Sequence, residues 1–208
     1  MEASSDTLAL FDFDGTLTVR DTFLDFLRFY HGNARFYTGM LALSPWLVAF
    51  KLGILPNWKA KERVLTWFWK SEKNRVFLDK CTDFQRRVLP NLVRPEAVAC
   101  LRAHQAAGHR VAVVSASAED WIGQWCQENN VTCLATRLER VGEGESSYLT
   151  GKLDGGNCYG EEKVKRIEAC FDRHMFSKVY AYGDSRSGDG PMLAWATLPR
   201  FRCFPMPC

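Results

Sequence analysis

An unbroken apolar run that ends in two carboxylates sets the strongest limit on how this chain can fold. Leu8 to Phe11 carries no polar side chain, and Asp12-Phe13-Asp14-Gly15-Thr16 follows directly. A short apolar run of this kind is typical of a parallel strand that is buried on both faces. Residues two apart in a strand point to the same side. Asp12 and Asp14 should therefore emerge together at the carboxyl end of the strand, where open α/β sheets bind ligands.

Two neighbouring carboxylates repel each other, and a hard divalent cation such as Mg²⁺ is their natural partner. The alternative for this segment alone is a strand that ends in a polar turn, with Asp14 and Gly15 as turn residues. On its own, the motif would favour the turn. Three further polar groups downstream reverse that balance.

The composition indicates a reduced, globular chain that does not bind nucleic acid. The 208 residues are 47% hydrophobic and 13% aromatic, and the net charge is only +3. The eight cysteines contain no Cys-x-x-Cys pair, which argues against a zinc site. The first six residues, Met1 to Asp6, lack the basic and then apolar run of a signal peptide. We therefore expect reduced thiols and a cytoplasmic location, with contact to a membrane left open.

The distribution of patterns predicts an α/β fold: a doubly wound parallel sheet with an inserted all-helical cap. From Pro95 onward, apolar strands alternate with amphipathic helices, as in a parallel sheet. Residues 21–94 show helical periodicity only. We therefore predict a discontinuous core, residues 1–20 plus 95–208, and a helical insert, residues 21–94. Within 132–150, Gly142 and Gly144 predict a hairpin turn.

The insert contains the most apolar part of the chain, residues 36–56, interrupted by Pro45 and Lys51. A membrane-spanning helix needs about 20 apolar residues, so the length favours a buried or interfacial helix. The next predicted helix mixes basic and aromatic side chains, a composition that suits a membrane surface or an anionic ligand. An ordinary amphipathic helix with a solvated basic face is the alternative. The basic residues are Lys59, Lys61 and Arg63, and the aromatic ones are Trp58, Trp67 and Trp69.

Polar groups follow two other predicted strands at the same edge of the sheet. Ser115 ends the strand that begins near Arg110, and Asp184 ends the strand that begins near Lys178. Together with Asp12 and Asp14, these side chains should converge. The chemistry that such a group suggests is phosphoryl transfer. A metal ion and a lysine neutralise the phosphate, one carboxylate attacks it, and a second carboxyl moves protons.

Each of these residues also has a simpler interpretation. Ser115 could cap the helix that begins near Ala118, Lys163 could be a surface lysine, and Asp184 could belong to a turn. Their occurrence together and in this order makes the simpler interpretations improbable as a set.

The motifs resemble those of the haloacid dehalogenase superfamily. They are Asp12-x-Asp14-Gly15-Thr16, Ser115 after an apolar strand, Lys163, and Gly183-Asp184 followed by Asp189. The helical insert after the first motif resembles the cap of the phosphoserine phosphatase-like branch. Ser115-Ala116-Ser117 and Gly160-Glu161-Glu162-Lys163 are most similar to the subgroup that contains the bacterial phosphatidylglycerophosphate phosphatase.

The resemblance implies a nucleophile at Asp12 and a general acid/base at Asp14. It implies Mg²⁺ held by Asp12, by the backbone carbonyl of Asp14 and by Asp184. A dehalogenase is disfavoured because Asp14 would have no task there.

The resemblance further implies that Ser115 and Lys163 bind the phosphoryl oxygens, and that Asp189 orients Lys163 or a metal-bound water. Asp21 stands where serine phosphatases of this branch carry a glutamate that reads the substrate ammonium. The shorter Asp21 and the absence of Gly-Gly after Ser115 count against phosphoserine. Four residues, instead of the usual three, separate Asp184 from Asp189.

The sequence thus favours a Mg²⁺-dependent phosphomonoester phosphatase that acts through an aspartyl-phosphate. The partner is a phosphorylated small molecule or a lipid headgroup. The lipid interpretation adds peripheral membrane contact through the insert. The alternatives are a soluble phosphatase for phosphoserine or another small metabolite, and a non-catalytic binding module on the same fold. The oligomeric state is left open.

Overall fold

The computed structural model describes residues 6–204. Residues 1–5, on which the expectation about a signal peptide rests, lie outside this range, as does Cys208. The seven cysteines within the described range are free thiols, as expected.

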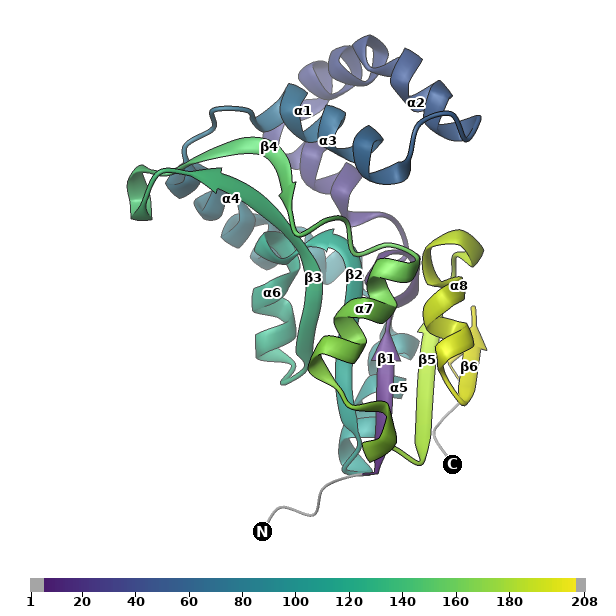
Figure 1. Cartoon of the computed structure of the whole chain (residues 1–208). Coiled ribbons are helices and arrows are strands. Elements are labelled where there is room, and N and C mark those ends of the chain that lie inside the picture. Colours follow the sequence, from purple (N-terminus) through teal and green to yellow (C-terminus); the bar gives the residue numbers. More distant parts are fainter. Residues whose placement is uncertain (1–5, 205–208) are drawn as a thin grey trace.

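Helix follows helix from residue 22 to residue 106, and strands and helices mostly alternate from residue 110 to residue 201 (Figure 1). The strands are β1 (Thr7–Phe11), β2 (Arg110–Ala118), β3 (Thr132–Val141), β4 (Tyr148–Asp154), β5 (Lys178–Gly183) and β6 (Leu198–Phe201). The helices are α1 (Thr22–Ala42), α2 (Ser44–Lys51), α3 (Asn57–Trp69), α4 (Asn74–Arg87), α5 (Pro95–Ala106), α6 (Glu119–Glu128), α7 (Glu161–Cys170) and α8 (Arg186–Trp195). Short helical turns are η1 (Phe13–Leu17), η2 (Leu89–Asn91), η3 (Gly144–Ser146) and η4 (Arg173–Met175).

The strands form one sheet in the order β4-β3-β2-β1-β5-β6. All neighbouring pairs are parallel except β3 and β4, which form the hairpin predicted around Gly142. The α/β prediction is therefore confirmed, with one antiparallel edge strand. Because β1 lies between β2 and β5, the carboxyl ends that carry Asp12, Ser115 and Asp184 are neighbours at one edge of the sheet.

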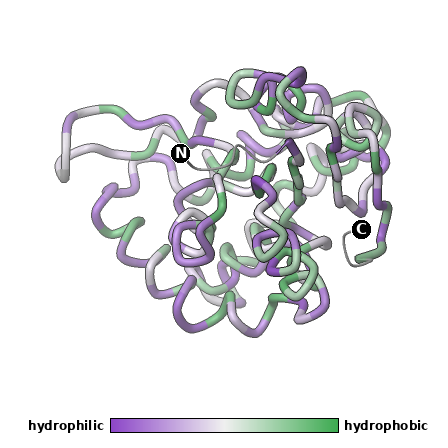
Figure 2. Tube along the Cα trace, turned by 90° about the horizontal axis from the view of Figure 1, so that it is seen from below, coloured by the Kyte–Doolittle hydropathy of each residue, from purple (hydrophilic) through white to green (hydrophobic). Residues whose placement is uncertain are grey.

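Alternate residues of the central strands pack against helices on opposite faces. One face of β1 presents Ala9 and Phe11 to a core that includes α5 and α6, and the other presents Leu8 and Leu10 to α7 and α8. This two-sided burial explains why the run from Leu8 to Phe11 is apolar throughout. Figure 2 shows hydrophobic and hydrophilic residues mixed along the outer helices, as one-sided burial of a helix requires.

The first helix of the insert, α1, is interrupted at Gly32. The backbone is non-helical at Gly32, with φ +74°, and the helix resumes beyond it. Glycine adopts this positive φ at little cost, and the helix breaks there. The apolar residues on the far side restart it, and Phe36 and Leu43 there are buried in the core.

The β3–β4 hairpin packs against the insert, a contact that the sequence did not reveal. Leu149 exchanges backbone hydrogen bonds with Ser71 and Glu72, at 2.8 and 2.9 Å. A side chain on Gly151 would collide with the backbone of Thr66 in α3, so this glycine lets β4 lie directly against the helix. Strand β4 thus ties the insert to the sheet.

The apolar stretch 36–56 is largely exposed. No residue of α2 is fully buried, and the side chains of Leu41, Leu52 and Ile54 are 75%, 69% and 75% exposed. None of the helices in the part of the chain that the structure describes combines the length and hydrophobicity that crossing a bilayer would require. We call the exposed apolar side chains of residues 37–67 the outer apolar face: Tyr37, Leu41, Trp46, Val48, Leu52, Ile54, Trp58 and Trp67.

Candidate active site

A buried lysine joins two carboxylates at the carboxyl edge of the sheet. The Nζ of Lys163, near the start of α7, donates to Oδ1 of Asp12 and to Oδ1 of Asp189, both at 2.6 Å. Lys163 is only 1% exposed. The interpretation of Lys163 as a surface lysine is therefore wrong, because a buried ammonium needs the paired charges found here.

Asp189 also shapes the loop that follows β5. Its Oδ2 accepts hydrogen bonds from the backbone N–H groups of Asp184 and Ser185, at 3.0 and 2.9 Å. A Cβ on Gly183 would lie 2.6 Å from the Cβ of Asp189, so Gly183 permits this close approach. Asp189 thereby connects Lys163 to the backbone that carries Asp184.

Gly15 is required at the turn after β1 for two reasons. Its φ is +80°, which residues with a side chain adopt only at a cost. A Cβ at this position would also lie 2.5 Å from Oδ2 of Asp184. The Asp-Gly pair is therefore a tight turn, as the simpler interpretation held, but a turn that brings the backbone against a carboxylate.

The acidic groups at this edge fit a divalent cation. One carboxylate oxygen each from Asp12, Asp184 and Asp189 lies within 4.8 Å of the others. Three carboxyls share this site with one lysine, Lys163, so negative charge is in excess. Burial raises the pKa of Asp12 to about 7, despite the nearby Lys163, and burial likewise raises the pKa of Asp184. A cation among the oxygens would favour their ionised forms and offset this cost.

Asp14 points toward the insert and is held by hydroxyl groups. Its Oδ1 accepts hydrogen bonds from the backbone N–H and the Oγ1 of Thr22, at 2.7 and 2.6 Å. Its Oδ2 accepts from the Oγ of Ser117 at 2.6 Å. Thr22 is fully buried and its hydroxyl lies 2.9 Å from that of Ser117. The two carboxylates of the first motif therefore line one site but have different partners.

Strand β2 continues three residues past Ser115, to Ala118, so the prediction that Ser115 ends the strand is wrong; Ser115 lies inside β2 and is fully buried. Its Oγ lies 3.4 Å from Oδ2 of Asp14 and accepts a hydrogen bond from the backbone N–H of Ser117 at 2.9 Å. It does not cap α6, whose N-cap residue is Ala118. The alternative role for Ser115 is therefore excluded.

Asp21 is the N-cap of α1. Its Oδ1 accepts hydrogen bonds from the backbone N–H groups of Phe23 and Leu24, at 2.8 and 3.3 Å. Asp21 nevertheless lines the cleft at the strand edge. The capping bonds give this residue a structural task that the sequence did not assign to it.

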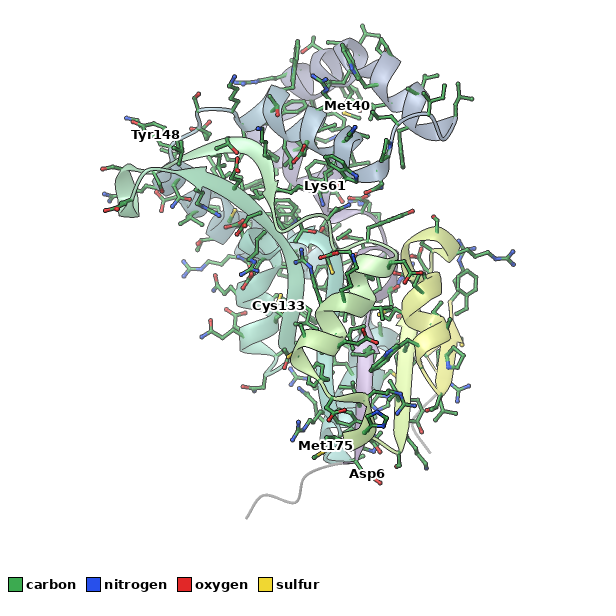
Figure 3. All side chains as sticks on the ribbon, in the orientation of Figure 1. Asp6, Met40, Lys61, Cys133, Tyr148 and Met175 are labelled. Carbon is green, nitrogen blue, oxygen red and sulfur yellow. The ribbon has the colours of Figure 1, made fainter. Side chains whose placement is uncertain are left out.

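Lys61 does not lie on a solvated basic face. From α3 its Nζ donates to the backbone oxygen of Ala116 and, at 3.1 Å, to Oδ1 of Asn157 (Figure 3). Burial lowers the pKa of Lys61 to about 8, although the nearby carboxylates of Asp14 and Asp21 act against this shift. The prediction that Lys61 lies on an exposed basic face with Lys59 and Arg63 is wrong, because the face of α3 that carries Lys61 packs toward the sheet. Trp69, counted among the surface aromatics, is buried as well.

Sequence reasoning missed Thr22, Ser117, Lys61 and Asn157 as members of the site. The signal for Ser117 was available, because it stands two residues beyond Ser115 in the same strand. Thr22 directly follows Asp21. Nothing in the sequence indicates that Lys61 and Asn157, 96 positions apart, meet.

Two cavities meet beside Asp14. The acidic cleft, of about 400 Å³, is lined by Asp12, Lys163, Asp184 and Asp189 among others. The apolar cavity, of about 220 Å³, lies where the insert meets the sheet edge. Its apolar walls are Phe23, Leu24, Met40, Leu47, Phe50, Ala60 and Val64. Asp14, Asp21, Ala116 and Tyr159 line both spaces. With a divalent cation among the carboxylates, the arrangement can hold an anion at the strand edge and an apolar group under the insert.

Comparison with known proteins agrees with this geometry. The family model of haloacid dehalogenase-like hydrolases matches residues 9–194. Protein CicA of Caulobacter vibrioides is 35% identical over 198 residues, which are 95% of this chain and 86% of that protein.

Solved structures share the fold. A protein of unknown function from Bordetella pertussis Tohama I superposes with a TM-score of 0.77 at 26% identity, over 94% of this chain and 89% of that one. A phospho-aspartyl intermediate analogue of phosphoserine phosphatase has a TM-score of 0.61 at 21% identity, over 94% and 85%. The motifs, the sheet and these matches lead to one assignment: the chain belongs to the haloacid dehalogenase-like hydrolase family.

Proposed function

We propose that this hydrolase is a Mg²⁺-dependent phosphomonoester phosphatase that works through an aspartyl-phosphate on Asp12. The observation that carries the proposal is the group of Asp12, Lys163, Asp184 and Asp189 at one edge of the sheet, with Asp14 directly beside it. A nucleophile, a cation to bind phosphate oxygens and a set of metal ligands are thereby in one cleft.

In the first step, an oxygen of Asp12 attacks phosphorus and the bond from phosphorus to the leaving oxygen breaks. Asp14 donates a proton to that oxygen. In the second step, Asp14 takes a proton from water, which attacks phosphorus and releases Asp12 and inorganic phosphate. Lys163 and Ser115 bind the phosphoryl oxygens.

Asp12, Asp184 and the backbone carbonyl of Asp14 would hold Mg²⁺, which supplies neutralisation of the phosphoryl charge. Asp189 keeps Lys163 and the Asp184 backbone in place through the hydrogen bonds described above. The phosphoryl group thus enters a site in which Lys163 and the Asp184 backbone are already held in position.

The test is hydrolysis of p-nitrophenyl phosphate with Mg²⁺, with EDTA, and by the variant Asp12→Asn. We expect activity only with Mg²⁺ and none from the variant, because an amide is a poor nucleophile. Acid-quenched wild-type protein should carry covalent phosphate. Asp79→Asn, at an exposed position of α4, is the matched control. Full activity in EDTA would refute the metal, and normal turnover by Asp12→Asn would refute the covalent route. A folded protein with no activity on any phosphomonoester would favour the non-catalytic binding module.

For the substrate, we propose a phosphomonoester in a lipid headgroup, reached by peripheral contact of the insert with a membrane. Trp46 and Trp67 on the outer apolar face are 40% and 53% exposed, instead of being packed in the insert core. Lys59 lies 5.2 Å from the ring of Trp58, and Arg63 lies 6.0 Å from that of Trp46. Exposed aromatic side chains beside basic ones suit an anionic bilayer surface.

Vesicle flotation tests the membrane contact. We expect binding to anionic vesicles that weakens as salt is raised, and weaker binding by the double variant Lys59→Glu/Arg63→Glu. The control, Lys165→Glu/Lys178→Glu, makes the same charge change at exposed positions of α7 and β5. Absence of binding, or an equal loss of binding in both double variants, would refute membrane contact through this face of the insert. Turnover of phosphoserine but not of lipid phosphates would favour the soluble metabolite phosphatase instead.

A further inference from the structure

Tyr159 occupies the place where three cavities meet. It lines the acidic cleft and the apolar cavity, and it also lines a third space of about 430 Å³ on the other side of Asn57 and Asn157. We call this third space the lateral cleft; its walls include Trp58, Glu62 and Glu162. The side chains of Asn157 and Asn57 hydrogen-bond to each other and stand between the apolar cavity and the lateral cleft.

The ring of Tyr159 is held at both its edge and its hydroxyl. The hydroxyl lies 2.6 Å from the Oγ of Ser187. A Cβ on Gly188 would be 3.0 Å from Cε2 of the ring, so the ring packs directly on the loop that carries Asp189. The next residue, Gly160, donates its backbone N–H to the oxygen of Gly188 at 2.9 Å. The ring is therefore a fixed wall.

We propose that Tyr159 is a specificity-determining residue, whose ring directs the leaving group of a bound phosphomonoester from the acidic cleft into the apolar cavity. The inference rests on the proposed function. A leaving group attached at the acidic cleft has two directions open to it, under the insert or into the lateral cleft. The acidic cleft shares four wall residues with the apolar cavity, Asp14, Asp21, Ala116 and Tyr159, but it shares Tyr159 alone with the lateral cleft.

This placement favours one class of substrate: phosphomonoesters whose ester oxygen is followed by an apolar group. Beyond the residues that it shares with the acidic cleft, the apolar cavity is lined by Met40, Leu47 and Phe50. Transfer of an apolar group from water into this cavity is therefore favourable. The ring adds contact area of its own, since aromatic side chains give large contact area at fixed geometry.

The experiment compares the affinities of two phosphonates, which a phosphatase cannot hydrolyse because their C–P bond replaces the ester. Naphthylmethylphosphonate carries an apolar group and methylphosphonate does not. Calorimetry with Mg²⁺ gives the ratio of their dissociation constants for wild type, Tyr159→Phe and Tyr159→Ala. Tyr148→Ala, a half-exposed tyrosine at the start of β4, is the control (Figure 3).

We expect wild type to prefer the naphthyl ligand, and Tyr159→Ala to lose about fivefold of that preference, the size of a lost aromatic contact. Tyr159→Phe and the control should keep it, because the ring at position 159 remains. In turnover of the corresponding phosphate esters, Tyr159→Ala should raise KM for the naphthyl ester and leave kcat unchanged.

An undiminished preference in Tyr159→Ala would overturn the proposal. An equal fall in Tyr159→Phe and Tyr159→Ala would also overturn it, because the hydroxyl anchor and not the ring would then be responsible. A wild type that binds both ligands equally well would overturn it too. If the preference behaves as expected but no ester is hydrolysed, the phosphatase proposal fails and the role of Tyr159 stands.

Discussion

Replacing Thr22 with valine tests whether the carboxylate of Asp14 is positioned for proton transfer. Valine has the shape of threonine but no hydroxyl, so it removes the 2.6 Å bond to Oδ1 of Asp14 and keeps the backbone bond at 2.7 Å. The lost hydroxyl also lies 2.9 Å from Ser117 Oγ and 3.4 Å from the indole nitrogen of Trp121. The substitution therefore weakens a buried network at three points.

The magnitude follows from the kind of bond that is lost. A hydrogen bond to a charged group is worth about 1.5–3 kcal/mol, and buried partners that are left unsatisfied cost more than exposed ones. Thr22 and Ser117 are both buried. We expect the free energy of unfolding to fall by about 2 kcal/mol, measured by urea denaturation at pH 7.

The kinetic effect should depend on the leaving group. General acid catalysis is worth about 10²–10⁴-fold when the leaving oxygen needs a proton. An alkyl phosphate needs that proton, whereas nitrophenolate leaves easily without it. With one of several bonds to Asp14 removed, we expect kcat to fall roughly tenfold for an alkyl phosphate and by less than about threefold for p-nitrophenyl phosphate.

The control is Thr38→Val, on the exposed side of the same helix, where the hydroxyl donates to the backbone oxygen of Ala34 at 3.0 Å. It should change the free energy of unfolding by less than about 0.5 kcal/mol and leave both rates unaltered. An equal fall in kcat for the two esters in Thr22→Val would refute a role in positioning the acid. An unchanged free energy of unfolding would refute the network.

Three further predictions concern the buried charges and the first turn. Lys163→Met should lower the free energy of unfolding by about 3–5 kcal/mol. The loss should be larger at pH 8 than at pH 5 in urea denaturation, because burial raises the pKa of Asp12 to about 7 and its protonation at the lower pH removes one of the unpaired charges; an equal loss at both pH values would contradict this. Gly15→Ala should weaken Mg²⁺ binding, measured by calorimetry, since its Cβ would displace the Asp184 carboxylate; an unchanged affinity would count against that position for the metal. Burial lowers the pKa of His104 to about 4, so the unfolded chain binds a proton that the folded chain does not between pH 6.5 and 4. Wild type should lose roughly 3 kcal/mol of stability over that range, and His104→Gln should be insensitive to this contribution in the same denaturation series.

The sequence by itself determined the sheet and the residues at its edge. Apolar runs that are buried on two faces have a composition that can be recognised locally, and each of the strands β1, β2 and β5 has a polar site residue at or near its carboxyl end. The rule that ligands bind at the carboxyl ends of parallel strands then places Asp12, Ser115 and Asp184 together without knowledge of the other contacts. The hairpin around Gly142 was predictable for the same reason, because turn residues act locally.

Only the tertiary structure decided how the insert packs against the rest of the chain. The same helical periodicity describes a basic face in water and one that packs on the sheet, so the sequence could not tell that Lys61 turns inward to Asn157. The contact of β4 with α3 depends on two segments about 85 residues apart, Thr66 and Gly151. Likewise, the sequence showed that residues 36–56 are apolar, but it did not show which surface they pack against. Whether such a surface is buried is set by the helices available to cover it, and in the described chain Leu41 and Ile54 have none.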